Sequence, residues 1–129
     1  QENGLAFSWC RIFYLYGEGE DPRRLVPYLR SRLAEGQPVD LTSGDQVRDF
    51  LDVRIAGEMI ANVATSDSRG VVTICSGEAV TVRAIAERIA DEYGRRDLLN
   101  FGSRRDNFTD PACVLGVLSS HQKEQDRLD

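Results

Sequence analysis

Arg48 is the residue whose surroundings in the sequence most clearly suggest a binding site. It lies in the segment Gly44-Asp-Gln-Val-Arg48-Asp49-Phe50, in which a polar turn leads into a short extended stretch. The planar guanidinium group can donate two parallel hydrogen bonds to phosphate oxygens, a geometry that a lysine ammonium group does not offer. The segment therefore predicts a phosphate-binding arginine. The residues leave one alternative open, an ion pair at the surface between Arg48 and either Asp49 or Asp52.

A second pair of arginines, Arg104 and Arg105, lies in the segment Ser103-Arg-Arg-Asp106. Adjacent arginines in a polar loop either form a solvated cluster of charges or clamp a phosphate group. The local sequence does not separate these two interpretations.

The tyrosines and carboxylates of the sequence do not form a recognisable catalytic centre. No tyrosine is followed four residues later by lysine, so these residues contain no Tyr-x-x-x-Lys pair. No two carboxylates are isolated in an apolar segment, where burial would separate their pKa values. We interpret Tyr14, Tyr16 and Tyr28 as core residues or as walls of a pocket.

The composition excludes several other kinds of site. Lys123 is the only lysine and His121 the only histidine, so a Ser-His-Asp triad, a Cys-His pair and a histidine-rich metal site lack their parts. The three cysteines, Cys10, Cys75 and Cys113, are odd in number and widely spaced. We interpret them as buried free thiols in a reducing compartment, and we expect a cytoplasmic protein.

The length and the charge of the chain limit the classes of protein to which it can belong. A chain of 129 residues has room for one domain with a sizeable core. Its net charge of −5 is spread evenly, with −3 in residues 1–64 and −2 in residues 65–129. Neither half is basic, which argues against a nucleic-acid partner. The longest apolar stretch, residues 5–16, contains Ser8 and Arg11, so we expect a soluble protein without a membrane span.

The segment Gly17-Glu-Gly19-Glu-Asp-Pro22 stands after a strand-like stretch, where a dinucleotide-binding fingerprint would stand. Its third glycine is replaced by Pro22. Three acidic residues, Glu18, Glu20 and Asp21, would repel a pyrophosphate. We therefore predict a turn here and no cofactor site.

The hydrophobic pattern predicts strands that need more neighbours than the sequence supplies. Residues 5–16 and 71–75 are continuous enough to indicate strands buried on both faces, as in a parallel sheet. Residues 38–41 and 47–51 are predicted as a short extended pair. A buried strand requires partners for its backbone groups. We expect the open edges to pair with a missing part of the same protein or with other copies of the chain.

Apolar residues at helical spacing predict three helices between these strands. They cover residues 27–34, 53–65 and 80–93. An apolar segment, residues 112–118, follows a polar stretch, and we expect residues 119–129 to be a disordered tail. The predicted fold class is α/β.

Four segments occur in an order and with a spacing that resemble a known family. Cys10-Arg11-Ile-Phe-Tyr-Leu-Tyr16-Gly17-Glu-Gly19 resembles an Arg-x-x-x-x-Tyr-Gly-Pro-Gly segment, and Arg24-Leu-Val-Pro27 with Gly36-Gln-Pro-Val39 resembles the helix and strand that follow it. Gln46-Val-Arg48-Asp49-Phe50-Leu-Asp-Val53 resembles an Arg-Asp-Phe-x-x-Val motif, and Ile74-Cys-Ser-Gly77 resembles a late Asn-Ile-Gly-Ser-Gly strand. The family is that of the extended short-chain dehydrogenases/reductases, the NAD-dependent epimerases and dehydratases of nucleotide sugars.

The resemblance covers about residues 3–118 and implies the C-terminal part of that fold. In the family, a glycine-rich NAD loop and a Tyr-x-x-x-Lys pair lie upstream of these segments, and neither is found here. The implied structure is the last strands and helices of a Rossmann-like parallel sheet plus the small substrate-binding lobe, incomplete on its own. Residues 1–118 would form this portion. NAD or NADP would serve the parent protein, and we expect neither to bind this chain tightly.

The resemblance also assigns roles to the arginines. Arg48 would contact the diphosphate of a nucleotide-sugar substrate. Arg105, or Arg104 in the same loop, would contact it from the other side. Val26 and Pro27 would line the nucleotide or sugar pocket.

Residues that follow the first predicted strand would lie near the substrate. These are Tyr16 and Gly17, while Tyr14 stands where sugar-nucleotide epimerases often have an asparagine that helps to hold phosphate or sugar. Two functions follow. The chain is the substrate-binding portion of an NAD(P)-dependent epimerase or dehydratase, inactive alone, or it is a non-catalytic, oligomeric binding or assembly module derived from that family.

Overall fold

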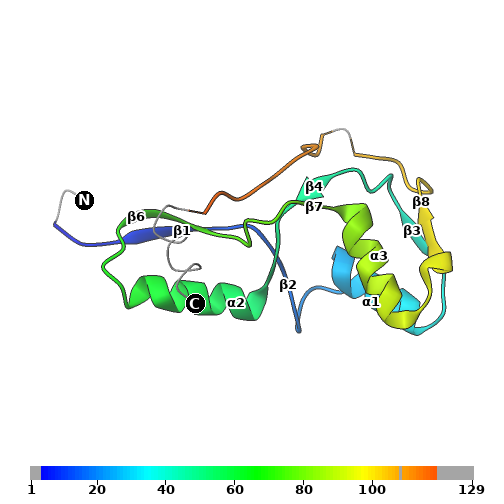
Figure 1. Cartoon of the computed structure of the whole chain (residues 1–129), viewed down its shortest axis with the longest axis horizontal. Helices are drawn as coiled ribbons and strands as arrows, with labels where there is room; N and C mark the ends of the chain where they lie inside the picture. Colours follow the sequence, from blue (N-terminus) through cyan, green and yellow to red (C-terminus); the bar gives the residue numbers. More distant parts are fainter. Residues whose placement is uncertain (1–3, 108, 119–129) are drawn as a thin grey trace. The chain divides into compact units, whose positions relative to one another are not determined.

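The computed structural model describes residues 4–107 and 109–118 of the chain. Figure 1 shows its helices and strands in chain order. The strands are β1 (Ser8–Ile12), β2 (Tyr14–Tyr16), β3 (Val39–Leu41), β4 (Val47–Arg48), β5 (Phe50–Asp52), β6 (Gly70–Ile74), β7 (Val80–Thr81) and β8 (Leu99–Phe101). The helices are α1 (Leu25–Ala34), α2 (Val53–Ala64), α3 (Val82–Tyr93) and the 3₁₀ helix η1 (Arg96–Leu98). None of the helices in the described part combines the length and apolar character that a membrane span requires.

The chain divides into two units. Unit 1 takes the described residues of 1–17, 49–78 and 115–129, and unit 2 takes residues 18–48 and 79–114. The predicted tail, residues 119–129, lies outside the described residues.

Unit 1 is built on two pairs of parallel strands and one helix. β1 pairs with β6, and β2 pairs with β5. Helix α2 begins at Val53 because the Asp52 carboxylate accepts a hydrogen bond from the backbone N–H of Arg54 at 2.8 Å. Its apolar side packs on the strands (Figure 1). Leu51, Ala56, Val72 and Ile74 form the buried hydrophobic core between α2 and these strands.

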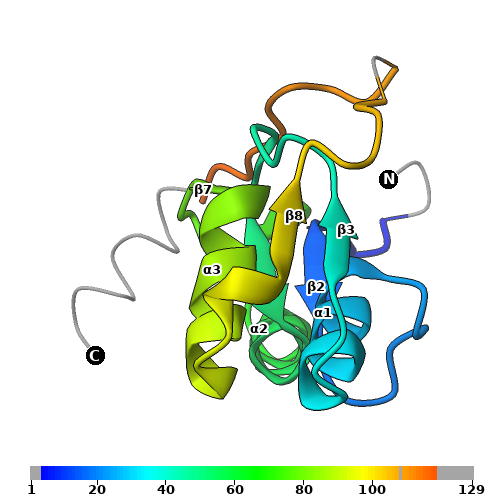
Figure 2. The same ribbon diagram turned by 90° about the vertical axis from the view of Figure 1, so that its right-hand side faces the viewer.

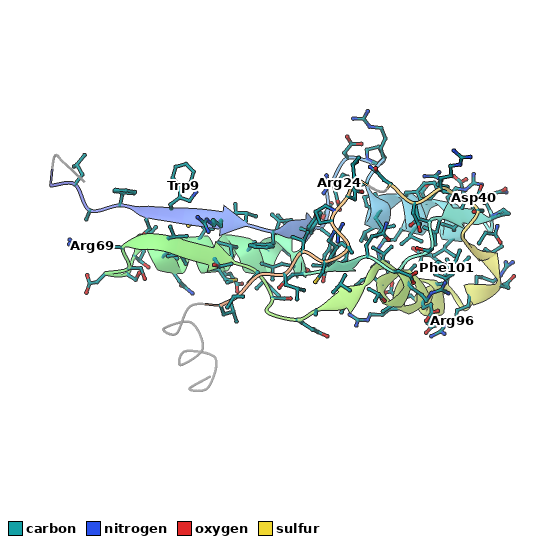
Figure 3. The ribbon with its side chains drawn as sticks, turned by 90° about the horizontal axis from the view of Figure 1, so that it is seen from above. Trp9, Arg24, Asp40, Arg69, Arg96 and Phe101 are labelled. Atoms are coloured by element: carbon teal, nitrogen blue, oxygen red, sulfur yellow. The ribbon has the colours of Figure 1, made fainter. Side chains whose placement is uncertain are left out.

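The first predicted strand is wrong in its extent. Residues 5–16 form two short strands, β1 and β2, separated at Phe13, and each pairs with a different partner. Within the described residues one face of the β1–β6 pair is covered, because α2 packs on the face that carries Cys10 and Val72. On the other face Trp9 and its register partner Val71 are 65% and 53% exposed. Figure 3 shows the Trp9 side chain projecting outward from β1.

Unit 2 packs two helices against a parallel strand pair. β3 and β8 run side by side, and α1 and α3 contact each other and these strands (Figure 2). Arg30 on α1 and Glu92 on α3 form an ion pair of 2.6 Å, and this hydrogen bond lowers the pKa of Glu92. The buried apolar side chains of the unit are Val26, Leu29, Leu33, Val39, Leu41, Ile85, Ala86, Ile89, Ala90 and Leu98.

The three predicted helices are present; α2 starts at Val53 as predicted, and the starts of α1 and α3 are shifted. α1 starts at Leu25, because Pro27 then lies in the first helical turn, where a missing backbone N–H costs nothing. α3 starts at Val82 rather than at residue 80. The Thr81 hydroxyl caps it by accepting a hydrogen bond from Ala84 N at 3.0 Å, which leaves residues 80–81 to form β7.

The predicted extended pair does not exist as a pair. β3 pairs in parallel with β8, a strand that the sequence did not predict. The second piece is interrupted at Asp49, and its halves have different partners: β4 pairs with β7 in antiparallel orientation, and β5 pairs with β2. The three cysteines are free, but Cys113 is exposed, so the prediction that all three are buried is wrong.

β4 and β5 are separated at Asp49 because the carboxylate of this residue binds the loop that follows β6. The residue is fully buried. Its Oδ1 accepts hydrogen bonds from the Ser76 backbone N–H and hydroxyl, and its Oδ2 accepts one from the Gly77 N–H, each at 2.8 Å. Beside it, burial raises the pKa of the Cys75 thiol, and the Asp49 charge adds to this shift. A Cβ atom on Gly116 would collide with Cys75, so that segment also requires glycine.

Asp49→Ala is expected to lower the free energy of unfolding by about 3 kcal/mol, because two N–H groups and a hydroxyl lose a charged acceptor in a buried position. Urea unfolding followed by circular dichroism measures this change. Asp67→Ala, an exposed aspartate of the same unit, is the matched control and should change stability by less than about 0.5 kcal/mol. Equal stability losses in both variants would contradict the anchoring role of Asp49.

Candidate functional site

The loops that follow β3 and β8 are joined to each other. Gly102 N donates to Thr42 O at 2.9 Å, Arg104 N donates to Leu41 O at 3.0 Å, and Ser43 N donates to an Asp106 carboxylate oxygen at 2.9 Å. β3 and β8 are parallel, so both loops leave from carboxyl ends of strands (Figure 2). Ligands of α/β proteins bind at this end of a parallel sheet.

The loop after β3 is held against the start of α3. The Arg83 guanidinium lies 3.9 Å from the centre of the Phe101 ring, and its Nη2 donates to Ser43 O at 3.0 Å. The backbone N–H of Arg83 donates to Gly44 O at 3.0 Å. Gly44 has a φ of +77° and is buried against Arg83, which leaves no room for a side chain.

The loop after β8 brings Arg104 to helix α1. Its guanidinium lies 5.0 Å from the centre of the Tyr28 ring, and its Nη2 donates to the Tyr28 hydroxyl at 3.3 Å. Tyr28 directly follows Pro27, which is half-buried, and Val26, which is buried. The structure therefore brings Arg104 to the helix that carries both predicted pocket residues. Arg105 is exposed.

Arg48 lies on β4 and is only 6% exposed. Its Nη1 donates to the carbonyl oxygen of Val47 at 2.8 Å, and it pairs with Val80 of β7 in the strand register. A surface ion pair with Asp49 is wrong, because both residues are buried. A buried arginine on a short strand is held in one place, as a phosphate-binding role requires.

The remaining predicted site residues belong to unit 1. Tyr14 and Tyr16 are half-buried on β2, and the Tyr14 ring lies 6.0 Å from that of Phe50. A Cβ atom on Gly17 would collide with the Val53 side chain, so Gly17 permits the close packing of the chain on α2.

The turn after Gly17 does not fit a dinucleotide. Asp21 is paired with Arg23 at 2.7 Å, and hydrogen bonds from Arg23 lower the pKa of Asp21, which keeps the carboxylate ionised. Glu20 lies 3.7 Å from the guanidinium of Arg24. A pyrophosphate would meet these carboxylates, and Gly17 is already used for packing. Among the described residues, no group of three or more His, Cys, Asp or Glu could hold a metal ion.

Comparison with known proteins identifies the family. Residues 1–75 match the model of the NAD dependent epimerase/dehydratase family. The chain belongs to this family. The family predicted from the four segments is thereby confirmed. A curated member, the CDP-abequose synthase of Salmonella muenchen, is 24% identical over 102 residues, which are 77% of this chain and 35% of that protein.

Solved structures support the fold. A UDP-N-acetylglucosamine 4-epimerase from Methanobrevibacter ruminantium, in complex with UDP-N-acetylmuramic acid, is 26% identical, with a TM-score of 0.79 over 93% of this chain and 40% of its own. The NAD complex of the UDP-glucose 4-epimerase from Thermus thermophilus is 22% identical, with a TM-score of 0.79 over 99% of this chain and 42% of its own. The predicted α/β, Rossmann-like fold is confirmed. The chain spans about a third of the curated relative and two fifths of these epimerases.

Two contacts of the site were not predicted from the sequence. Tyr28 was interpreted only as a core or pocket residue, whereas its ring and hydroxyl hold Arg104. The stacking of Arg83 on Phe101 was not predicted at all. The signal available was weak: Leu99-Asn-Phe101 alternates apolar and polar residues before Gly102, as a short strand does.

Gly44→Ala is expected to lower the free energy of unfolding by about 1–2 kcal/mol, because alanine at positive φ is strained and its Cβ would lie 3.0 Å from the Cβ of Arg83. Gly57→Ala is the matched control, since Gly57 lies in α2 with no atom near its would-be Cβ. That variant should gain about 1 kcal/mol from helix propensity. Urea unfolding measures both, and a change of the same sign in both variants would contradict the constraint at Gly44.

Proposed function

We propose that this chain forms the nucleotide-sugar-binding portion of an NAD- or NADP-dependent epimerase or dehydratase. The observation that carries the proposal is the pair of joined loops at the carboxyl ends of β3 and β8, which present Arg104 and Arg105. Family membership and relatives that are named for nucleotide sugars support the same substrate class.

In this proposal each predicted residue has a separate task. Arg48 donates hydrogen bonds to the oxygens of the substrate diphosphate, and Arg104 or Arg105 does so from a second direction. Val26 and Pro27 contribute to the wall of the nucleotide or sugar pocket.

The proposal also gives substrate contacts to residues of β2 and to the residue that follows it. Tyr16 and Gly17 lie near the sugar. Tyr14 offers it a phenolic hydroxyl where related epimerases often have an asparagine amide. The tyrosine hydroxyl can both donate and accept a hydrogen bond, so it can satisfy a sugar hydroxyl of either polarity.

The cofactor belongs, in this proposal, to other parts of a longer protein. Bound NAD(P) supplies redox chemistry at a sugar carbon in such enzymes. The acidic turn at residues 18–21 argues against a cofactor phosphate site there. The chain alone is therefore proposed to bind substrate without turning it over. Its three free cysteines favour a reducing compartment such as the cytoplasm.

One observation supports a second candidate beside the first, an oligomeric binding or assembly module without catalysis. The β1 side of unit 1 exposes a row of apolar side chains, with Leu5 69%, Phe7 49%, Trp9 65% and Val71 53% accessible. Apolar rows of this kind are covered in functional proteins. The first proposal covers them with the rest of a longer protein, including further sheet strands, and the second covers them with other copies of the chain.

Oligomeric state separates these two candidates. Sedimentation velocity of the purified chain across a range of concentrations should give a stable, discrete oligomer if copies complete one another. The substrate-binding proposal expects no discrete oligomer. Trp9→Ser is the matched test, because loss of this exposed indole should dissociate a true oligomer and leave a monomer unchanged.

Arg48→Ala is expected to raise the Kd for a nucleoside diphosphate at least about tenfold, or about 1.4 kcal/mol. Isothermal titration of the full chain with UDP, CDP and dTDP measures the Kd. Arg48→Lys keeps the charge but loses the two-pronged geometry, so its Kd should lie between those of the wild type and the alanine variant.

Arg69→Ala is the matched control, since Arg69 is an exposed arginine of unit 1 (Figure 3) that the proposal does not use. Circular dichroism shows whether each variant is folded. An unchanged Kd in a folded Arg48 variant would remove Arg48 from the site. If the wild-type chain binds none of the three nucleotides, the proposed function itself is wrong.

A further inference from the structure

We infer that Tyr28 is a positioning residue, which holds the guanidinium of Arg104 in place for the substrate diphosphate. This inference rests on the proposed function and selects Arg104 from the two arginines of the loop. It starts from the contact between α1 and the loop after β8, where the Arg104 guanidinium lies 5.0 Å from the Tyr28 ring centre.

Arg104 is held at both ends. Its backbone N–H donates to Leu41 O at 3.0 Å, which fixes where the side chain begins. Its Nη2 donates to the Tyr28 hydroxyl at 3.3 Å, and the ring attracts the cation through its negative face. Tyr28 itself is half-buried, and its neighbours on α1, Val26 and Leu29, belong to the core. The position of the ring is therefore set by the fold rather than by the loop.

The contact leaves Arg104 able to bind a ligand. A guanidinium group has five N–H donors, and the Tyr28 hydroxyl uses one of them. The donors that remain can form a two-pronged contact with phosphate oxygens. An arginine that is already ordered loses less side-chain entropy when it binds a ligand, and it therefore binds the ligand more tightly.

The side chain of Arg105 is not held in place in this way. It is exposed, and it makes no side-chain hydrogen bond or ion pair with the residues that the structure describes. Of the two neighbouring arginines, Arg104 alone has an aromatic partner among these residues. The geometry therefore favours Arg104 as the arginine that meets the diphosphate.

The test is a double-mutant cycle in UDP binding, measured on the full chain by isothermal titration. Tyr28→Phe keeps the ring and loses the hydroxyl, and its Kd should rise about twofold to threefold. Tyr28→Leu loses both contacts, and its Kd should rise about fivefold to tenfold. In an Arg104→Ala background, Tyr28→Leu should raise the Kd by less than about twofold, because the residue acts through Arg104.

A structural role for Tyr28 would give a different pattern. In that case Tyr28→Leu would weaken binding equally with and without Arg104, and the inference would be overturned. A rise in Kd confined to Arg105→Ala would overturn it as well. Tyr93→Leu, at a partly exposed tyrosine of α3, is the control for loss of a tyrosine from unit 2 and should leave the Kd unchanged.

The inference and the proposed function fail in distinguishable ways. If Arg48→Ala weakens UDP binding and the Tyr28 variants do not, the function stands and the role of Tyr28 falls. If the wild-type chain binds no UDP, CDP or dTDP, the proposed function falls first. A ligand-free measurement then still tests the contact: the ¹⁵Nε resonance of Arg104 should shift in Tyr28→Leu, and an unchanged resonance would show that the two side chains do not meet.

Discussion

The buried carboxylate of Asp49 is the interaction on which the rest of unit 1 depends. It accepts two backbone N–H groups and a hydroxyl from Ser76 and Gly77, at the end of β6. These donors would otherwise be buried without an acceptor, which costs more than an ordinary hydrogen bond contributes. By holding the residue at the junction of β4 and β5, the same carboxylate also interrupts what would be one strand. Arg48, the residue before it, is the last residue of β4 and is buried as well.

Unit 2 solves a related problem with arginine and aromatic rings. The loops after β3 and β8 carry polar residues, and loops of this kind are ordinarily mobile. Here Arg83 of α3 lies over the Phe101 ring and donates to Ser43 O in the loop after β3, and Arg104 of the loop after β8 lies over the Tyr28 ring of α1, so each loop is tied to a helix. A guanidinium can stack and donate hydrogen bonds at once, whereas a lysine ammonium cannot stack. The near absence of lysine from the sequence is thus compatible with an ordered polar surface.

Local patterns predicted the helices better than the strands. α2 and α3 have apolar residues at helical spacing, and their ends depend on local signals: in α3 these are the Thr81 cap at the start and Gly94, in the left-handed conformation, at the end. Strand pairing depends on residues far along the chain, which no local pattern contains. The division of residues 47–51 follows from the contact of Asp49 with Ser76, 27 positions later. β8 is three residues long and carries little signal of its own.

The site was predictable only in part for the same reason. Motif spacing singled out Arg48 and the Arg104–Arg105 pair, because guanidinium groups beside polar turns are typical of phosphate sites. Which of the two neighbouring arginines is held depends on Tyr28, which is 76 positions from Arg104. Nothing in the sequence around Tyr28 indicates that its side chain contacts Arg104.

The route of the chain through its two units has a practical consequence. The backbone passes from one unit to the other after residues 17, 48, 78 and 114, so each unit is assembled from separated stretches. No single pair of start and stop codons can therefore produce either unit alone, and a single proteolytic cut cannot release one. Separate study of a unit requires a circularly permuted or re-linked gene. Evolution faces the same limit, because neither unit can be shuffled into another protein as one exon-like block.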